Sequence, residues 1–259
     1  AITIWDYERL VLEKFPQLYM VKCFAATSKK QLKPSPGHVL VVVVPKVVEK
    51  DSVATQGYLV NAVEIKEIED YLKPLMPANI KLEVCNPSYE IIQIRCVVKF
   101  SKKLNTGQFV KKLNQAISNY ISPWSGKGYG VKFDWTIRKK DIESYILDLP
   151  YVSDVSRFSI IDVFMREDKP KKYSLIDSAA ERIKTTHSNN RSRDDISSSV
   201  AWSLAISAKT HYIEVIDSEK NMLNREAEPV GINNISIGST FIINGTRAIS
   251  EGNNSDAIA

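Results

Sequence analysis

The stretch HVLVVVVP, His38 to Pro45, is an almost unbroken run of valine and other apolar residues. β-Branched residues favour strands, and a continuous apolar run is typical of a strand that is buried on both faces. We therefore predict that His38 to Pro45 is the central strand of a sheet. The run is far shorter than the ~18–20 residues that a membrane helix needs, so we expect no membrane partner.

The residues that follow alternate between helical and strand periodicity. The pattern predicts helices at residues 61–75 and 105–121, and strands at residues 80–85, 89–100 and 130–137. Asn86-Pro87-Ser88 is typical of a hairpin turn between the strands at 80–85 and 89–100. The order β-α-β-β-α-β is that of a ferredoxin-like split β-α-β domain. We expect a four-stranded antiparallel sheet in residues 38–137, with both helices on one face.

The segments on either side complete an α+β fold: a ferredoxin-like domain with an N-terminal helix and a β-rich C-terminal extension. Thr3 and Asp6 match a capping box, so we expect a helix that ends near Phe15, before Pro16. A strand is expected at residues 19–25, a helix near 140–148 and strands near 155–164, 200–206, 211–216 and 235–243. The expected parts are residues 1–37 (helix, strand and linker), 38–165 (ferredoxin-like domain), 166–199 (charged linker) and 200–259 (small β-rich end).

The expected linker, residues 166–199, has many charges and few large apolar side chains. Such a segment buries little surface to offset the entropy of ordering its backbone, about 1–2 kcal/mol per residue. We expect neighbouring subunits to order it, with apolar anchors at Tyr173, Leu175, Ile176 and Ile183. The alternative is that the segment folds back onto its own domain.

Composition narrows the class of protein. The chain has 259 residues and a net charge of +5, which is too small to indicate nucleic acid by itself. The spacing of Cys23, Cys85 and Cys96 fits neither a zinc site nor a disulfide framework, so we expect free thiols, a reducing compartment, and no metal or cofactor. The chain begins with Ala1 rather than Met, so we expect a trimmed or partial product.

No motif indicates catalysis. His38, His187 and His211 lie far apart in the sequence, without a His-Glu-x-x-His pattern or a Gly-x-Ser-x-Gly elbow. We expect that none of the three pairs with both a nucleophile and a carboxylate. We therefore expect no catalytic residues and no small-molecule substrate.

One motif favours nucleic acid. Lys127-Gly128-Tyr129-Gly130-Val131-Lys132-Phe133 is similar to the RNA-recognition signature K/R-G-F/Y-G/A-F-V-x-F/Y. It lacks the aromatic residue before the valine, on which a base would stack, and it lies on the fourth expected strand instead of the third. A nucleic-acid-binding module stays open as the alternative, with phosphate contacts from Lys102, Lys103, Arg138 and Lys139. The third functional alternative is an uncharacterised hydrolase.

Several phrases together resemble a known family. They are Thr3-Ile4-Trp5-Asp6-Tyr7-Glu8-Arg9-Leu10, FPQLYMVKC at residues 15–23, PGHVLVVVVP at residues 36–45, Asn86-Pro87-Ser88-Tyr89, Tyr120-Ile121-Ser122-Pro123 and Leu149-Pro150-Tyr151-Val152-Ser153-Asp154-Val155. They resemble the carboxy-terminal part of baseplate J-like wedge proteins of contractile phage tails and contractile injection systems. The resemblance covers residues 1–165, with a weaker likeness around Ala201 to Ser207.

The resemblance implies a structural, non-enzymatic role. Wedge proteins surround the central hub, and we expect partners among other wedge subunits, the hub or spike, the sheath and the fibres. Such a subunit would be cytoplasmic during assembly and then part of a phage tail-like particle. The expected interface residues are Trp5, Tyr7, Tyr173, Leu175, Ile176, Ile183 and Trp202.

Overall fold

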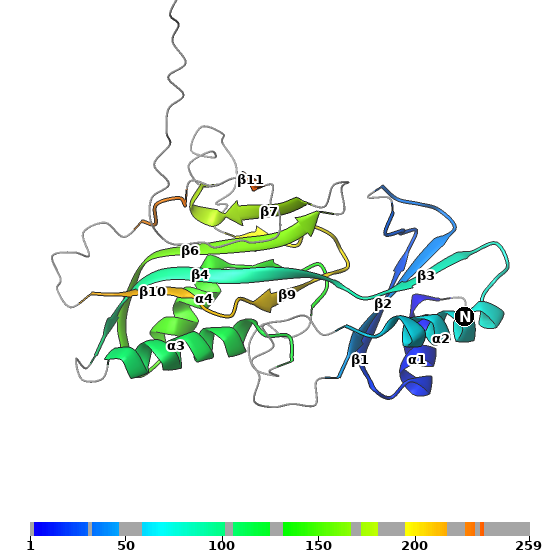
Figure 1. Cartoon of the computed structure of the whole chain (residues 1–259), viewed down its shortest axis with the longest axis horizontal. Coiled ribbons are helices and arrows are strands. Elements are labelled where there is room, and N and C mark those ends of the chain that lie inside the picture. Colours follow the sequence, from blue (N-terminus) through cyan, green and yellow to red (C-terminus); the bar gives the residue numbers. More distant parts are fainter. Residues whose placement is uncertain are drawn as a thin grey trace, which may run out of the picture.

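The elements of the chain form two bodies that lie side by side, each built on its own sheet (Figure 1). The structure is a computed structural model. It describes residues 3–30, 33–46, 59–101, 106–124, 132–166, 172–180, 195–216, 226–230 and 234–235. We call the two sheets the small sheet, with three strands, and the large sheet, with six.

The first helix, α1 (Ile4–Lys14), begins at the predicted capping box. Thr3 Oγ1 accepts a hydrogen bond from the Asp6 backbone N–H at 3.2 Å, and Asp6 Oδ2 accepts one from the Thr3 N–H at 2.9 Å. The helix ends at Phe15, before Pro16, as expected. Tyr7 and Val11 lie on its buried face.

Replacing Thr3 with alanine should lower the free energy of unfolding by about 1 kcal/mol. The substitution removes the side-chain oxygen that accepts from the Asp6 backbone N–H in the first turn, where this N–H also donates to the Thr3 carbonyl oxygen at 3.1 Å. Urea denaturation followed by circular dichroism measures the change. Lys14→Ala is the control, because that exposed residue ends the helix without capping its first turn. Equal stability of Thr3→Ala and wild type would contradict the role of the cap.

The small sheet has the order β1-β2-β3, with β1 (Leu18–Ala25) antiparallel and β3 (Lys81–Cys85) parallel to β2 (His38–Pro45). The central position predicted for His38–Pro45 is confirmed in this sheet. Helices α1 and α2 (Ala62–Leu72) bury one face of the sheet, and a short 3-10 helix, η1 (Lys73–Leu75), follows α2. The run of valines is explained by burial on both faces, because Leu40 and Val42 face a second cluster.

The prediction of one four-stranded sheet in residues 38–137 is wrong. Strand β4 (Ser88–Phe100) does not pair with β3 as a hairpin but continues into the large sheet, where it pairs with β6 (Val152–Arg166) (Figure 1). At the expected turn, the Asn86 side chain accepts a hydrogen bond from the Val60 N–H and donates one to its C=O, at 2.8 and 2.9 Å. These bonds hold Asn86 to the segment before α2, and the ferredoxin-like topology is not confirmed.

The two predicted helices therefore cover different sheets. Helix α2 packs on the small sheet, whereas α3 (Thr106–Ile121) packs on the large sheet with α4 (Lys139–Leu147). Of the strand expected at residues 130–137, the structure describes a short β5 (Thr136–Ile137) that pairs with β8 (Ile196–Ser197). Residues 130 and 131 lie outside the described part of the chain.

The large sheet has the order β10-β4-β6-β7-β11. Its remaining strands are β7 (Lys172–Asp177), β9 (Ser203–Ser207), β10 (Tyr212–Val215) and β11 (Asn234–Ile235). Strands β9 and β10 both pair in parallel with β4, β9 along Ser88–Ile92 and β10 along Arg95–Val98. The two strands thus act as one interrupted strand at the edge of β4.

The expected division into parts is altered at two places. The boundary at residue 37 separates β1 from β2, although these strands pair. The expected linker at residues 166–199 contains β7, which pairs along β6, so this portion folds back onto its own sheet. Of the strand expected at 235–243, only Ile235 is described, as the end of β11. No helix among the described residues is long and apolar enough to cross a membrane.

Candidate functional site

The exposed aromatic side chains are the first candidates for contacts with other proteins. Trp5 on α1 is 63% exposed, and the Arg9 guanidinium carbon lies 5.2 Å from the centre of its ring. Tyr173 on β7 is 44% exposed. Both belong to the expected interface residues, and their exposure leaves them accessible to a partner.

The other expected interface residues have different positions. Tyr7, Leu175 and Trp202 are buried within the chain, so they stabilise its core and cannot contact a partner without rearrangement. Ile176 is partly buried against the core that α3 and α4 cover. Ile183 lies outside the described residues. The expectation for Tyr7, Leu175 and Trp202 is corrected, because aromatic and aliphatic residues in a sequence do not reveal which ones the fold itself buries.

Trp202 has a clear structural role at the junction of the two bodies. Its side chain, 6% exposed, precedes β9 of the large sheet and packs with Leu40, Val42 and Cys85 of the small sheet. Phe24 and Phe133 pack against the same cluster with their ring centres 5.6 Å apart, nearly edge to face. The junction is therefore an apolar core of its own.

His211 lies buried between β9 and β10, where the edge strand is interrupted. Its Nδ1 accepts a hydrogen bond from the Ile94 N–H of β4 at 3.1 Å. Its Nε2 lies 3.2 Å from Ser118 Oγ of α3 and 3.1 Å from Ser207 Oγ of β9, and its own backbone N–H donates to Asn114 Oδ1 at 2.8 Å. The ring thus joins the sheet, its edge strand and the covering helix.

This geometry fixes the protonation of the ring and argues against catalysis there. Because Nδ1 accepts from a backbone N–H, the neutral ring carries its proton on Nε2 and donates to the serine hydroxyls. A histidine that donates to a serine cannot take that serine's proton as a general base. Burial lowers the pKa of His211 to about 4, which keeps the ring neutral at pH 7.

The other two predicted histidines lie elsewhere. His38 opens β2, and its Nδ1 is 3.3 Å from the Pro36 carbonyl oxygen. His187 is outside the described residues. The described part of the chain therefore gives His38 and His211 separate structural surroundings.

Two acidic residues lie in the core of the large sheet, and the sequence analysis missed them. Glu90 of β4 and Asp162 of β6 are fully buried. Glu90 Oε1 accepts hydrogen bonds from the Ser199 N–H at 3.0 Å and from Ser199 Oγ at 2.8 Å. Both acids occupy inward-facing positions of their strands, as Ile92 and Ile160 do. An acid at a position where the alternating pattern expects an apolar residue was the signal in the sequence.

The three cysteines are free and buried, as the sequence predicts free thiols. Burial raises the pKa of Cys23 and of Cys96 to about 12, so both thiols are protonated and unreactive at neutral pH. Within the described ranges, no three His, Cys, Asp or Glu side chains gather as a metal site would require.

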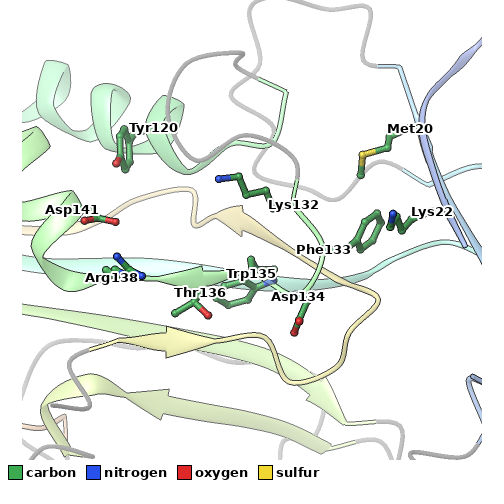
Figure 2. Close-up of a pocket in the computed structure, with 10 residues that line it drawn as sticks. All are labelled: Met20, Lys22, Tyr120, Lys132, Phe133, Asp134, Trp135, Thr136, Arg138 and Asp141. Carbon is green, nitrogen blue, oxygen red and sulfur yellow. The ribbon is translucent and has the colours of Figure 1, made fainter. Parts of the chain in front are cut away.

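A hollow of about 680 Å³ lies beside the junction of the two bodies (Figure 2). Lys22 and Phe133 lie at one end, and Tyr120, Arg138 and Asp141 at the other. Its described lining mixes three basic and two acidic side chains and includes no histidine, cysteine or serine: Met20, Lys22, Tyr120, Lys132, Phe133, Asp134, Trp135, Thr136, Arg138 and Asp141. This lining offers charged side chains of both signs to a ligand.

Comparisons with family models and with solved structures each found a similar protein. The family model described as "Baseplate protein PVC11-like" matches residues 1–174, which include the whole small sheet and strands β4 and β6. Among solved structures, a chain of the anti-feeding prophage baseplate, determined by electron cryomicroscopy with 6-fold symmetrisation, is similar in fold, with a TM-score of 0.52 and 12% sequence identity. No curated protein matches the chain.

The structural similarity covers unequal shares of the two chains. The structural similarity covers 81% of this chain but 38% of the anti-feeding prophage chain, so this chain spans less than half of that protein's length. The chain belongs to the PVC11-like family of baseplate proteins.

Proposed function

We propose that the chain is a structural wedge subunit in the baseplate of a contractile injection system. In this role it links the hub to the sheath and the fibres and transmits the conformational change that triggers contraction. The observation that carries the proposal is the family match over residues 1–174. The similarity in fold to a chain of the anti-feeding prophage baseplate supports it.

The proposed partners are other proteins of the baseplate: wedge subunits, the hub or spike, the sheath and the fibres. Assembly takes place in the cytoplasm, and the finished subunit is part of a phage tail-like particle. The role requires stable protein contacts and no turnover of a substrate. The buried junction around Trp202 suits it, because a subunit that transmits a movement needs its two bodies firmly joined.

The surface around Trp5 is the proposed contact with a partner. Tryptophan and arginine are the residues most enriched among the energetically dominant positions of protein interfaces. Here the Arg9 guanidinium lies over the Trp5 ring while Glu13 Oε1 accepts a hydrogen bond from Arg9 Nε at 2.8 Å. Arg9 is thus held in place, which lowers the entropy that a partner must remove on binding.

Replacing Trp5 with alanine should weaken incorporation into the baseplate at least tenfold while the fold stays intact. An exposed tryptophan contributes little to folding, but its loss from an interface typically costs about 2 kcal/mol or more. The measurement compares the amount of tagged subunit recovered in purified particles when wild-type and variant chains are co-expressed. The melting temperature of each isolated chain is determined alongside.

Tyr19→Ala is the matched control, because Tyr19 is an aromatic residue with 45% exposure on β1 that no sequence argument places at the interface. Unchanged incorporation of Trp5→Ala would remove this surface from the proposal. Binding of the chain to RNA or DNA with a steep dependence on salt, and none to particles, would favour the nucleic-acid alternative.

A further inference from the structure

The buried acids Glu90 and Asp162 form a pair whose hydrogen bonds are unequal. The Glu90 carboxylate accepts hydrogen bonds from the backbone N–H and the hydroxyl of Ser199. Neither Asp162 oxygen accepts a hydrogen bond from a protein donor in the described part of the chain. Asp162 lies directly opposite Ile92 of β4, so it is a diagonal neighbour of Glu90 on the same face of the sheet. Two ionised carboxylates without a cation between them repel each other strongly in a core.

The elements packed around the pair supply no described positive charge. The inward positions of β4 and β6 next to it are Ile92, Ile160 and Phe164, and Ile176 of β7 lies directly opposite Asp162. Strand β9 contributes Ala205, opposite Glu90 on β4, and two serines in the same register, Ser203 and Ser207. Among described residues, Glu90 is the one charged group that acts on Asp162.

We propose that Asp162 is protonated at neutral pH and donates a hydrogen bond to Glu90, and that this one-proton pair is a pH-sensitive latch that holds Ser199 and strand β9 against β4. The proton satisfies the Asp162 oxygen and leaves one negative charge, on Glu90, where Ser199 donates to it. Removal of the proton leaves two buried negative charges next to the hydrogen bonds that join Ser199 to Glu90. The inference concerns the internal mechanics of this chain and does not rest on the proposed function.

The latch acts at one end of the edge strand and His211 at the other. Ser199 precedes β9, and His211 follows it. Burial and the neighbouring Glu90 charge raise the pKa of Asp162 well above its ordinary value. A raised pKa in the folded state means that stability is lost as pH rises from the ordinary value near 4 to the folded value, by up to about tenfold in the opening constant per pH unit.

His211 contributes the opposite dependence, because its pKa is lowered. Its contribution to stability rises with pH between about 4 and 6.5 and is constant above that range. The two dependences oppose each other in acid, whereas above pH 6.5 the latch acts alone. The range above pH 6.5 is therefore the one in which the proposal can be tested.

Hydrogen exchange of the full chain between pH 6.5 and 8.5, divided by the intrinsic exchange rate, tests the latch. The opening constant of residues 199–207 should rise with pH, by up to about tenfold per pH unit, relative to residues 39–44 of β2. In Asp162→Asn the asparagine amide donates to Glu90 without a titratable proton, so the opening constant should stay flat. Asp148→Asn, at an exposed site after α4, should behave as wild type.

Infrared spectroscopy gives a second readout on the wild-type chain, in case Asp162→Asn does not fold. At pH 7 the wild type should show the C=O stretch of a protonated buried carboxyl, and this band should disappear as pH is raised. A flat opening constant in the wild type, an equal rise in Asp162→Asn, or the absence of a protonated carboxyl band at pH 7 would each overturn the proposal.

Discussion

Replacing Trp202 with alanine should lower the free energy of unfolding by about 3–5 kcal/mol, which is the range for a buried tryptophan or phenylalanine truncated to alanine. Trp202 is 6% exposed and packs with Leu40, Val42 and Cys85 across the junction of the two bodies. The substitution leaves a cavity between the small sheet and the start of β9. Because total stabilities of domains are only about 5–15 kcal/mol, much of the chain's stability would be lost.

Urea denaturation followed by tryptophan fluorescence and circular dichroism measures this loss. Trp5→Ala is the matched control, since it removes the same side chain from an exposed helix position and should change stability by less than about 0.5 kcal/mol. The junction account predicts a large difference between the two variants. Similar effects of Trp202→Ala and Trp5→Ala would show that the junction contributes little to folding.

Acidification from pH 6.5 to pH 4 should destabilise the fold by about 3 kcal/mol through His211. In the unfolded chain histidine binds a proton near pH 6.5, whereas burial lowers the pKa of His211 in the folded protein to about 4. Between these values the unfolded state binds the extra proton, so stability falls as pH falls and levels off below pH 4. The physical cause is burial, which keeps water from the charged ring; the charged ring would also lose its Nδ1 acceptor role at the Ile94 N–H.

His211→Asn isolates this contribution. The asparagine Oδ1 can accept from the Ile94 N–H as Nδ1 does, and the amide does not titrate. The difference in unfolding free energy between wild type and His211→Asn should therefore shrink by about 3 kcal/mol between pH 6.5 and pH 4. Other acids, including Asp162, titrate in both proteins and cancel. A difference that does not change with pH would contradict the assignment of a neutral, buried His211.

Local patterns in the sequence predicted the elements that depend on near neighbours. The capping box at Thr3 and Asp6 set the start of α1, and the valines of His38–Pro45 set the central strand of the small sheet. Helices α2, α3 and α4 also lie where apolar residues recur at helical spacing. These features follow from hydrogen bonds and periodicity within one segment, so a single sequence is enough to find them.

Pairing between distant segments was not predictable in the same way. Asn86 and Pro87 are typical of a turn. In the structure, however, the Asn86 side chain forms hydrogen bonds with the Val60 backbone, and β4 belongs to a different sheet from β3. Strand β4 also pairs in parallel with β9 and β10, more than a hundred positions later in the chain. Periodicity reveals that a segment is a strand but not which strand lies beside it.

The positions of the candidate site residues also depend on pairing between distant segments. The sequence could name Trp5 and Trp202 as large aromatic residues, but only the fold separates the exposed one from the buried one. Glu90 and Asp162 each interrupt an inward apolar register, a signal visible in the sequence. Their proximity, and the bond of Glu90 to Ser199, depend on tertiary pairing that no local pattern contains.

The central claim is that this chain is a structural part of a contractile injection baseplate, and electron cryomicroscopy of particles from cells with and without its gene tests it most directly. The account predicts baseplate density that fits both bodies of the chain in wild-type particles, and no complete baseplate when the gene is deleted. Reintroducing the gene should restore the baseplate. Complete particles that contract normally without the chain would contradict the claim.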